Sequence, residues 1–345
     1  MKFLNLLLGA AVAGASVAAP VANASTPDTN TDKRASKFRF VGVNQSGAEF
    51  GKDTLPGQLG KHYTWPSKSS IDTLIGKGMN TFRVAIMMER LIPNKMTGNV
   101  DAAYAQGLTD IVSHITNRGA YAVIDPHNFG RYYEQVITDV DGFKAWWTTT
   151  AGMFANNDKV IFDTNNEYHD MDNLLVFRLN QAAIDGIRAA GATSQLIFIE
   201  GNSWTGAWTW VSSGNGAALL NLKDPASSNT DKLVYEMHQY LDRDGSGTSE
   251  TCVSATIGQE RVREATAWLK ANGKKAILGE TAGGANAQCI AALTGMLSYM
   301  ASNSDVWTGW LWWGGGPWWG NYMFSLEPPS GVAYERVLPS LLPYF

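Results

Sequence analysis

The chain has 345 residues, of which 27 are basic and 31 acidic, so its formal net charge is −4. This length allows one large domain or two ordinary ones, and 45% hydrophobic against 17% charged residues exclude an intrinsically disordered chain. The moderate charge, with no dense run of Lys or Arg, argues against nucleic acid as a partner. The unusual feature is aromatic: many of the 13 Trp stand in polar or Gly-rich segments, which suggests a flat, polar ligand that stacks on them.

The N-terminal residues predict export. Residues 1–24 are typical of a secretory signal peptide: Lys2 precedes the apolar stretch Phe3–Val12, small residues follow, and cleavage at several positions from 18 to 24 fits. Residues 25–34 end in Lys33-Arg34 and are interpreted as a propeptide, with a solvated linker as the alternative. We therefore expect a secreted, extracellular protein with one folded domain over 35–345. No segment has the length and hydrophobicity of a membrane span, so we expect no membrane association.

The cysteines and histidines bear on covalent links and metals. The chain has two cysteines, Cys252 and Cys289, and in a secreted protein this small even count suggests one disulfide. Two cysteines alone make no zinc site, and the histidines form no His-Glu-x-x-His pattern. We expect neither a metal nor a cofactor. Asn44 begins a glycosylation sequon but ends an apolar strand, so we expect it to be unused.

Eight short apolar runs typical of β-strands recur at an even spacing along the chain. They are Phe38–Asn44, Thr81–Ile86, Ala120–Pro126, Val160–Glu167, Leu196–Gly201, Leu233–Tyr240, Lys275–Thr281 and Trp307–Trp313. Amphipathic helices are predicted between several of them, over Asp101–Arg118, Asp172–Ala190 and Gln259–Asn272, each followed by Gly. This pattern predicts an α/β fold, a single (β/α)8 TIM barrel. The alternative, a doubly wound sheet, lacks its glycine-rich phosphate loop after the first strand.

Polar side chains close most of these runs, where a barrel of this type concentrates its function. They are Arg83, His127, Asn128, Asn166, Glu167, His238, Tyr240, Glu280, Trp312 and Trp313. Glu167 and Glu280 end the fourth and seventh runs, and two carboxylates are the minimum for cleaving a glycosidic bond. The alternative is that each is only a salt-bridge partner of Arg83. A set of polar residues from most of the strands favours catalysis.

The tryptophans favour a sugar ligand, because pyranose rings present C–H faces that pack on flat aromatic rings. One group follows the fifth run and another the eighth: Trp204, Trp208, Trp210, Trp313, Trp318 and Trp319. Core packing is the expectation for the others considered: Trp146, Trp147, Trp268, Trp307 and Trp310.

Six motifs, taken together and in order, resemble glycoside hydrolase family 5, and most closely its fungal secreted endo-β-1,4-glucanases (cellulases). They are Phe82-Arg83-Val84, Asp125-Pro126-His127-Asn128, Thr164-Asn165-Asn166-Glu167, Met237-His238-Gln239-Tyr240, Leu278-Gly279-Glu280-Thr281 and Trp310-Leu311-Trp312-Trp313. The likeness extends from about Phe38 to Phe345. An Asn-Glu at the fourth strand and a Glu at the seventh define the clan of barrels to which this family belongs.

The resemblance implies a retaining, double-displacement mechanism with Glu167 as acid/base and Glu280 as nucleophile. It further implies that Asn166 holds the sugar 2-hydroxyl and that Arg83 and Tyr240 contact Glu280. It also implies that His127 and His238 orient the substrate and the acid/base. Trp313 is then a platform for the sugar, and Asn128 supports the site.

The expected partner is β-1,4-linked glucan and its oligosaccharides, and the expected state is a monomer. Within the same chemistry, β-mannan, xyloglucan and mixed-linkage glucan stay open as substrates. A remote alternative is a non-catalytic carbohydrate-binding barrel, although such proteins usually lose a catalytic carboxylate and both are present here.

Overall fold

Eight parallel strands close into a barrel in the computed structural model, which describes residues 38–345. The strands are β1 (Phe40–Gln45), β2 (Thr81–Ile86), β3 (Tyr121–Pro126), β6 (Val160–Asp163), β7 (Ile197–Glu200), β8 (Leu233–His238), β9 (Ala276–Thr281) and β10 (Trp307–Gly315). They follow chain order around the barrel, and β10 pairs with β1 to close it. The predicted signal peptide and propeptide lie outside the described residues.

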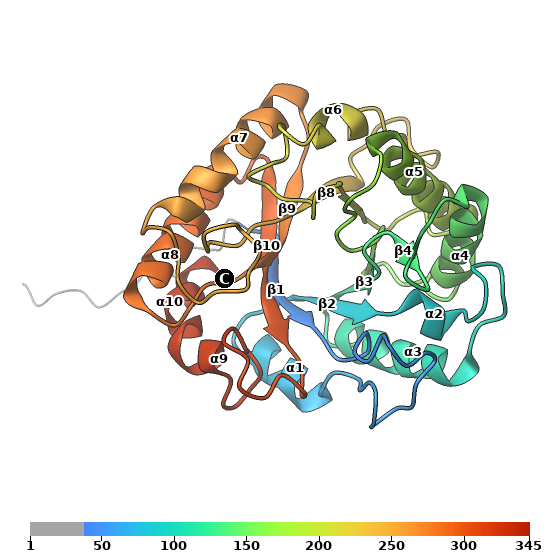
Figure 1. Ribbon diagram of the computed structural model, residues 1–345, viewed down its shortest axis with the longest axis horizontal. Coiled ribbons are helices and arrows are strands. Elements are labelled where there is room, and N and C mark those ends of the chain that lie inside the picture. Colours follow the sequence, from blue (N-terminus) through green and yellow to red (C-terminus); the bar gives the residue numbers. More distant parts are fainter. Residues whose placement is uncertain (1–37) are drawn as a thin grey trace, which may run out of the picture. The chain divides into compact units, whose positions relative to one another are not determined.

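Helices surround the strands, as Figure 1 shows, and confirm the predicted (β/α)8 fold. They are α1 (Lys68–Gly76), α2 (Met88–Leu91), α3 (Ala102–Thr116), α4 (Val140–Gly152), α5 (Asn173–Ala189), α6 (Asn215–Leu219), α7 (Ile257–Asn272), α8 (Ala287–Ser302), α9 (Val332–Arg336) and α10 (Leu338–Leu341), with a final 3-10 turn Leu342–Tyr344. A small hairpin, β4 (Arg131–Tyr132) and β5 (Gln135–Val136), follows β3. No helix among residues 38–345 is both long and apolar enough to cross a membrane.

Side-chain caps begin the helices where the sequence predicts them. Asp101 accepts a hydrogen bond from the Tyr104 N–H at the start of α3, and Asp172 accepts from Leu174 and Leu175 at the start of α5. Each cap satisfies backbone donors that have no partner within the helix. The helix α7 ends at Gly273, whose φ of 59° lies in the left-handed region that glycine adopts without strain.

Two strands end at least two residues before their predicted end, and both differences affect the site. β6 ends at Asp163 rather than Glu167, and β8 ends at His238 rather than Tyr240. Glu167 has a φ of 48°, which no β-strand accommodates. Glu167 and Tyr240 therefore project from the loops that follow the strands.

Most of the tryptophans expected in the core are there, and one more joins them. Trp146, Trp147, Trp307 and Trp310 are fully buried, and Trp268 is half-buried against them. The expectation that Trp210 belongs to the sugar-binding group is wrong: it is fully buried, with its ring edge-on to Tyr235 and Trp268. Trp210 precedes α6 in the chain and packs on a residue of β8 and one of α7, neighbours that a sequence pattern does not reveal.

The predicted disulfide is present. Cys252, in the loop after β8, bonds to Cys289 in the first turn of α8, with a Cα–Cα distance of 5.3 Å. Linking two segments 37 residues apart stabilises the fold by about 3–4 kcal/mol in the chain-entropy account.

Candidate active site

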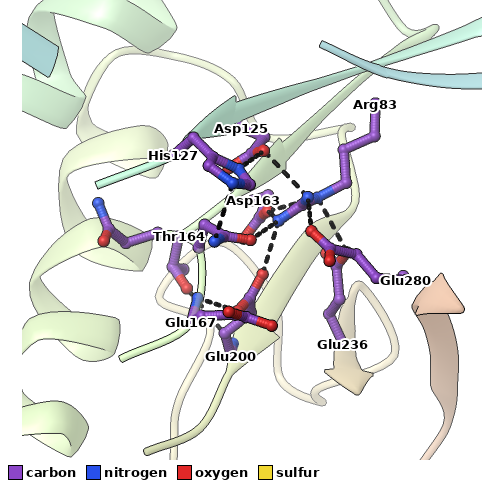
Figure 2. A network of polar contacts seen from close by, with 12 residues as sticks. Arg83, Asp125, His127, Asp163, Thr164, Glu167, Glu200, Glu236 and Glu280 are labelled. Carbon is purple, nitrogen blue, oxygen red and sulfur yellow. Dashed lines mark hydrogen bonds and ion pairs between the residues drawn. The ribbon is translucent and has the colours of Figure 1, made fainter. Parts of the chain in front are cut away.

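Arg83 stands at the centre of the carboxyl-terminal end of the barrel, and its guanidinium is fully buried. Five carboxylates lie within 3.0 Å of its nitrogens, and Figure 2 shows them converging on it. They come from β3, β6, β7, β8 and β9: Asp125, Asp163, Glu200, Glu236 and Glu280. Two asparagine oxygens, of Asn44 and Asn166, also accept from Arg83 at 2.9 and 2.8 Å.

One arginine cannot neutralise five carboxylates, and the protonation of the buried acids reflects this imbalance. Burial raises the pKa of Asp163 well above its ordinary value, and the nearby charge of Glu236 adds to the effect. Burial, followed by the charge of Asp163, likewise raises the pKa of Glu200. The carboxylates in turn raise the pKa of Arg83 against the opposing effect of burial. The cluster therefore holds protons that separated carboxyl groups would release.

Glu280, at the end of β9, is the acid of this cluster that reaches the surface of the site. Its Oε1 accepts from Arg83 Nη1 at 2.9 Å and its Oε2 from the Tyr240 hydroxyl at 2.7 Å. Both contacts confirm the geometry expected from the sequence. Burial and the charge of Glu280 raise the pKa of Tyr240 well above its usual range, so this hydroxyl keeps its proton and donates a hydrogen bond to the carboxylate.

Glu167 approaches Glu280 from the opposite loop. One of its carboxylate oxygens, the nearest Glu280 oxygen and His238 Nδ1 all lie within 4.8 Å of one another. His238 Nδ1 is 2.8 Å from Glu167 Oε1 and 3.6 Å from Glu280 Oε2. Burial alone would lower the pKa of His238, but Glu280 and Glu200 raise it well above the ordinary value. His238 thus lies between the two carboxyl groups. Among the described residues these three side chains form one of two groups that could ligate a metal ion, and the other is Glu200, Glu236 and His238.

His127 and Asn166 form the next part of the site. His127 Nδ1 bonds the Asp125 carboxylate at 2.8 Å, and its Nε2 lies 3.3 Å from the Asn166 amide nitrogen. Burial lowers the pKa of His127, and the charge of Asp125 more than compensates, so the net shift is upward. Asn128 supports the neighbouring segment: its side chain accepts from the Met88 N–H and donates to Glu89, which fixes the residues after β2.

The aromatic residues of the site form two groups: rings exposed to solvent and rings that stack on another aromatic side chain. Trp204, Trp208 and Trp318 are 50%, 46% and 41% exposed, which is unusual for this side chain. Trp313 is half-buried and stacks on His127 with ring centroids 5.1 Å apart, and Trp319 stacks on Tyr322 at 4.2 Å.

Two pockets open near the site, one containing Glu167 and the other containing His127. One, of about 520 Å³, is lined by Glu167, Trp204, Trp208, His238 and Tyr240 among others. The other, of about 480 Å³, contains His127 together with residues of the loops after β1, β2 and β3. The first pocket therefore reaches Glu167, and the second reaches His127, whose Nε2 lies 3.3 Å from the Asn166 amide nitrogen.

Sequence reasoning missed most of the acids around Arg83. Asp163, Glu200 and Glu236 were not singled out, and Asp125 appeared only within a motif. The signal was available, because each stands two residues after a buried apolar residue on its strand: Val123, Ile161, Phe198 and Val234. Since alternate residues of a strand share a face, each acid had to point into the barrel with its apolar predecessor.

Comparison with known proteins places this geometry in a family. The family described as "Cellulase (glycosyl hydrolase family 5)" matches residues 43–316. The chain is 59% identical over 344 residues to "Probable endo-beta-1,4-glucanase B" of Neosartorya fischeri, covering 100% of this chain and 99% of that one. Among solved structures, the endo-β-1,4-glucanase Xac0029 from Xanthomonas axonopodis pv. citri is similar, with a TM-score of 0.83 and 38% identity over 89% of this chain and 99% of the other. The structure of XacCel5A in complex with cellopentaose is similar to the same degree, with a TM-score of 0.83 and 36% identity over the same shares. The chain therefore belongs to the cellulase family, glycosyl hydrolase family 5, and is a glycoside hydrolase.

Proposed function

We propose that this protein is a retaining endo-β-1,4-glucanase in which Glu280 is the nucleophile and Glu167 the acid/base. The observation that carries the proposal is the separation of the two acids, whose nearest carboxylate oxygens lie within 4.8 Å. Retaining glycosidases hold their two carboxyl groups about 5–5.5 Å apart, whereas inverting ones leave about 6.5–9.5 Å for a water molecule. An oxygen–oxygen separation below 4.8 Å fits the retaining arrangement better than the inverting one.

The contacts of each acid suit its role. Glu280 accepts from Arg83 and Tyr240, and both bonds favour the ionised carboxylate that a nucleophile needs. Glu167 is the more exposed of the two, with 15% of its side chain accessible against 4% for Glu280, and its contact with His238 orients it toward the pocket. A leaving group that departs toward solvent meets Glu167 first.

The reaction follows in two displacements. The Glu280 carboxylate attacks the anomeric carbon, the glycosidic C–O bond breaks, and Glu167 donates its proton to the departing oxygen. Glu167, now ionised, takes a proton from water, whose oxygen attacks the same carbon and returns the bonding pair to Glu280. Asn166 lies between Arg83 and His127, which fits an amide that holds the sugar 2-hydroxyl as charge develops on the ring.

The proposed substrate is β-1,4-glucan cut at internal bonds. One pocket contains Glu167 and a second contains His127, and exposed Trp204, Trp208 and Trp318 offer platforms for several sugar rings. The names of the relatives and the cellopentaose complex support glucan over mannan.

Replacement of Glu280 by Gln tests the proposal. The substitution removes the nucleophile and keeps the shape, so we expect kcat on carboxymethylcellulose to fall by at least about 10⁴-fold with little change in the thermal unfolding midpoint. Exposed Glu264 on α7 provides the matched control, and Glu264→Gln is expected to keep wild-type activity. Near-normal activity of Glu280→Gln would refute the assignment.

The substrate is tested on the wild-type protein. A rapid fall in the viscosity of carboxymethylcellulose with few new reducing ends would support internal cleavage of glucan. Cleavage of β-mannan alone would leave the proposed mechanism standing and would contradict the assignment of β-1,4-glucan as the substrate.

Secretion is part of the same proposal. The Cys252–Cys289 disulfide is stable in an oxidising environment, which agrees with an exported enzyme acting on a polymer. N-terminal sequencing of the protein from culture medium tests the predicted signal peptide and the processing after Arg34. Recovery of the chain inside cells only would contradict the proposal.

A further inference from the structure

We propose that Glu200 is a positioning residue for the acid/base: its buried carboxylate fixes the backbone of Glu167 relative to Arg83 and thereby to Glu280. This inference rests on the proposed function, since it takes Glu167 as the acid/base. Glu200 touches neither pocket, so its role is exerted through Glu167.

The first observation is the backbone of Glu167. Its φ of 48° is in the left-handed region, which is unfavourable for a residue with a side chain and persists only where the surroundings enforce it. Its N–H has left the sheet, because β6 ends at Asp163. Glu200 Oε2 accepts this N–H at 2.5 Å, and the Glu200 side chain itself is fully buried.

The second observation is what holds Glu200. It is the last residue of β7, and its Oε1 pairs with Arg83 Nη2 at 2.9 Å. Its backbone carbonyl accepts from the Asn180 amide at 2.9 Å, so both the side chain and the main chain are fixed. Arg83 in turn donates to Glu280 through Nη1.

These bonds form one continuous connection from the acid/base to the nucleophile beneath the site. It runs from the Glu167 N–H through the Glu200 carboxylate and the Arg83 guanidinium to Glu280 (Figure 2). His238 makes a second connection above it, through the side chains. Double displacement requires a fixed separation of the two acids, and the lower connection sets it through the backbone.

Glu200→Gln separates the two functions of the carboxylate, which are to pair with Arg83 and to accept the Glu167 N–H. Arg83 has only donors, so the amide oxygen of Gln must face it, and the amide NH2 then faces the Glu167 N–H. The bond to the acid/base is lost while the shape of the side chain is retained.

The dependence of kcat/KM on the leaving group reports on the acid/base alone. We expect Glu200→Gln to lower kcat/KM on phenyl β-cellobioside, whose leaving group needs a proton, by about 10–100-fold. On 2,4-dinitrophenyl β-cellobioside, whose leaving group departs without a proton, the decrease in kcat/KM should be less than about 3-fold. Azide should raise kcat on the second substrate, since it attacks the anomeric carbon without base assistance and returns the bonding pair to Glu280.

Glu236→Gln is the matched comparison. Glu236 is the register partner of Glu200 on β8, is equally buried, and lies 3.0 Å from Arg83 Nε, but it makes no hydrogen bond to Glu167. Its substitution is expected to change activity on the two substrates by the same factor. If Glu200 had a purely structural role, Glu200→Gln would also lower activity on the two substrates by the same factor. Such an equal decrease would overturn the inference.

Glu167→Ala distinguishes the two proposals. If it shows the leaving-group dependence and azide effect while Glu200→Gln does not, the inference fails and the proposed function stands. If Glu167→Ala shows neither, the assignment of the acid/base fails. Should Glu200→Gln not fold, Glu200→Asp keeps the charge but shortens its reach, and the same dependence on the leaving group is required of it.

Discussion

Two layers of side chains inside the barrel come from the same strands and differ in chemistry. The lower layer is apolar and fully or almost fully buried: Phe40, Val123, Ile161, Phe198, Val234, Ile277 and Leu311. Two residues further along β3, β6, β7 and β8, the side chains point inward again, and all four are acids paired with Arg83. One backbone geometry therefore supports either a packed core or a charged site.

The difference shows where stability and function separate. The lower layer gains free energy from the removal of apolar surface from water and needs no particular partner. The upper layer loses hydration, and recovers this cost only while Arg83 and the carboxylates remain together. A loss of side-chain volume in the lower layer and a loss of charge in the upper layer should therefore have unequal effects on stability and activity.

Replacing Arg83 by Met should have the largest effect. It leaves five carboxylates without their cation, so we expect the free energy of unfolding at pH 7 to fall by about 3–5 kcal/mol and kcat/KM to fall by at least about 10²-fold. Denaturant unfolding and assays on carboxymethylcellulose measure the two effects. The loss of stability should shrink at pH 4, where protons neutralise the acids. A loss that is the same at both pH values would show that the carboxylates are not the cause.

His238 provides a pH-dependent test of the upper layer. Its pKa is raised in the folded protein, so its contribution to stability is complete below the unfolded pKa of about 6.5 and is lost as the pH rises through the folded pKa. The difference in unfolding free energy between wild type and His238→Gln should decrease over this window by about 1.4 kcal/mol for each unit of pKa rise. Thermal unfolding from pH 5 to pH 10 follows it. A difference that grows with pH would contradict a protonated His238.

Ile161→Val probes the lower layer and should have the smallest effect. It removes one methylene from a buried side chain, for which we expect a loss of about 0.5–1.5 kcal/mol and activity within about 2-fold of wild type. Unfolding midpoints and kcat on carboxymethylcellulose measure both. A large loss of activity with this small loss of stability would mean that the two layers are not independent.

Much of the fold was predictable because it depends on local patterns. The segment Asp101–Arg118 was predicted as an amphipathic helix, and Tyr104, Leu108 and Ile111 are buried in α3. The eight strands were recognisable as apolar runs at even spacing, and their boundaries differ from those observed mostly by one or two residues. The exceptions, at Glu167 and Tyr240, lie where loop geometry overrides strand propensity.

The sequence by itself determined the barrel, the disulfide between its two cysteines and the pair Glu167 and Glu280, because strand periodicity and chain order specify which side chains face one mouth. Only the tertiary structure decided that Glu200 binds the backbone of Glu167, that Trp210 is buried, and that five acids share Arg83. These features join residues that are apart in the chain, and they form only when the strands, loops and helices that carry those residues pack together.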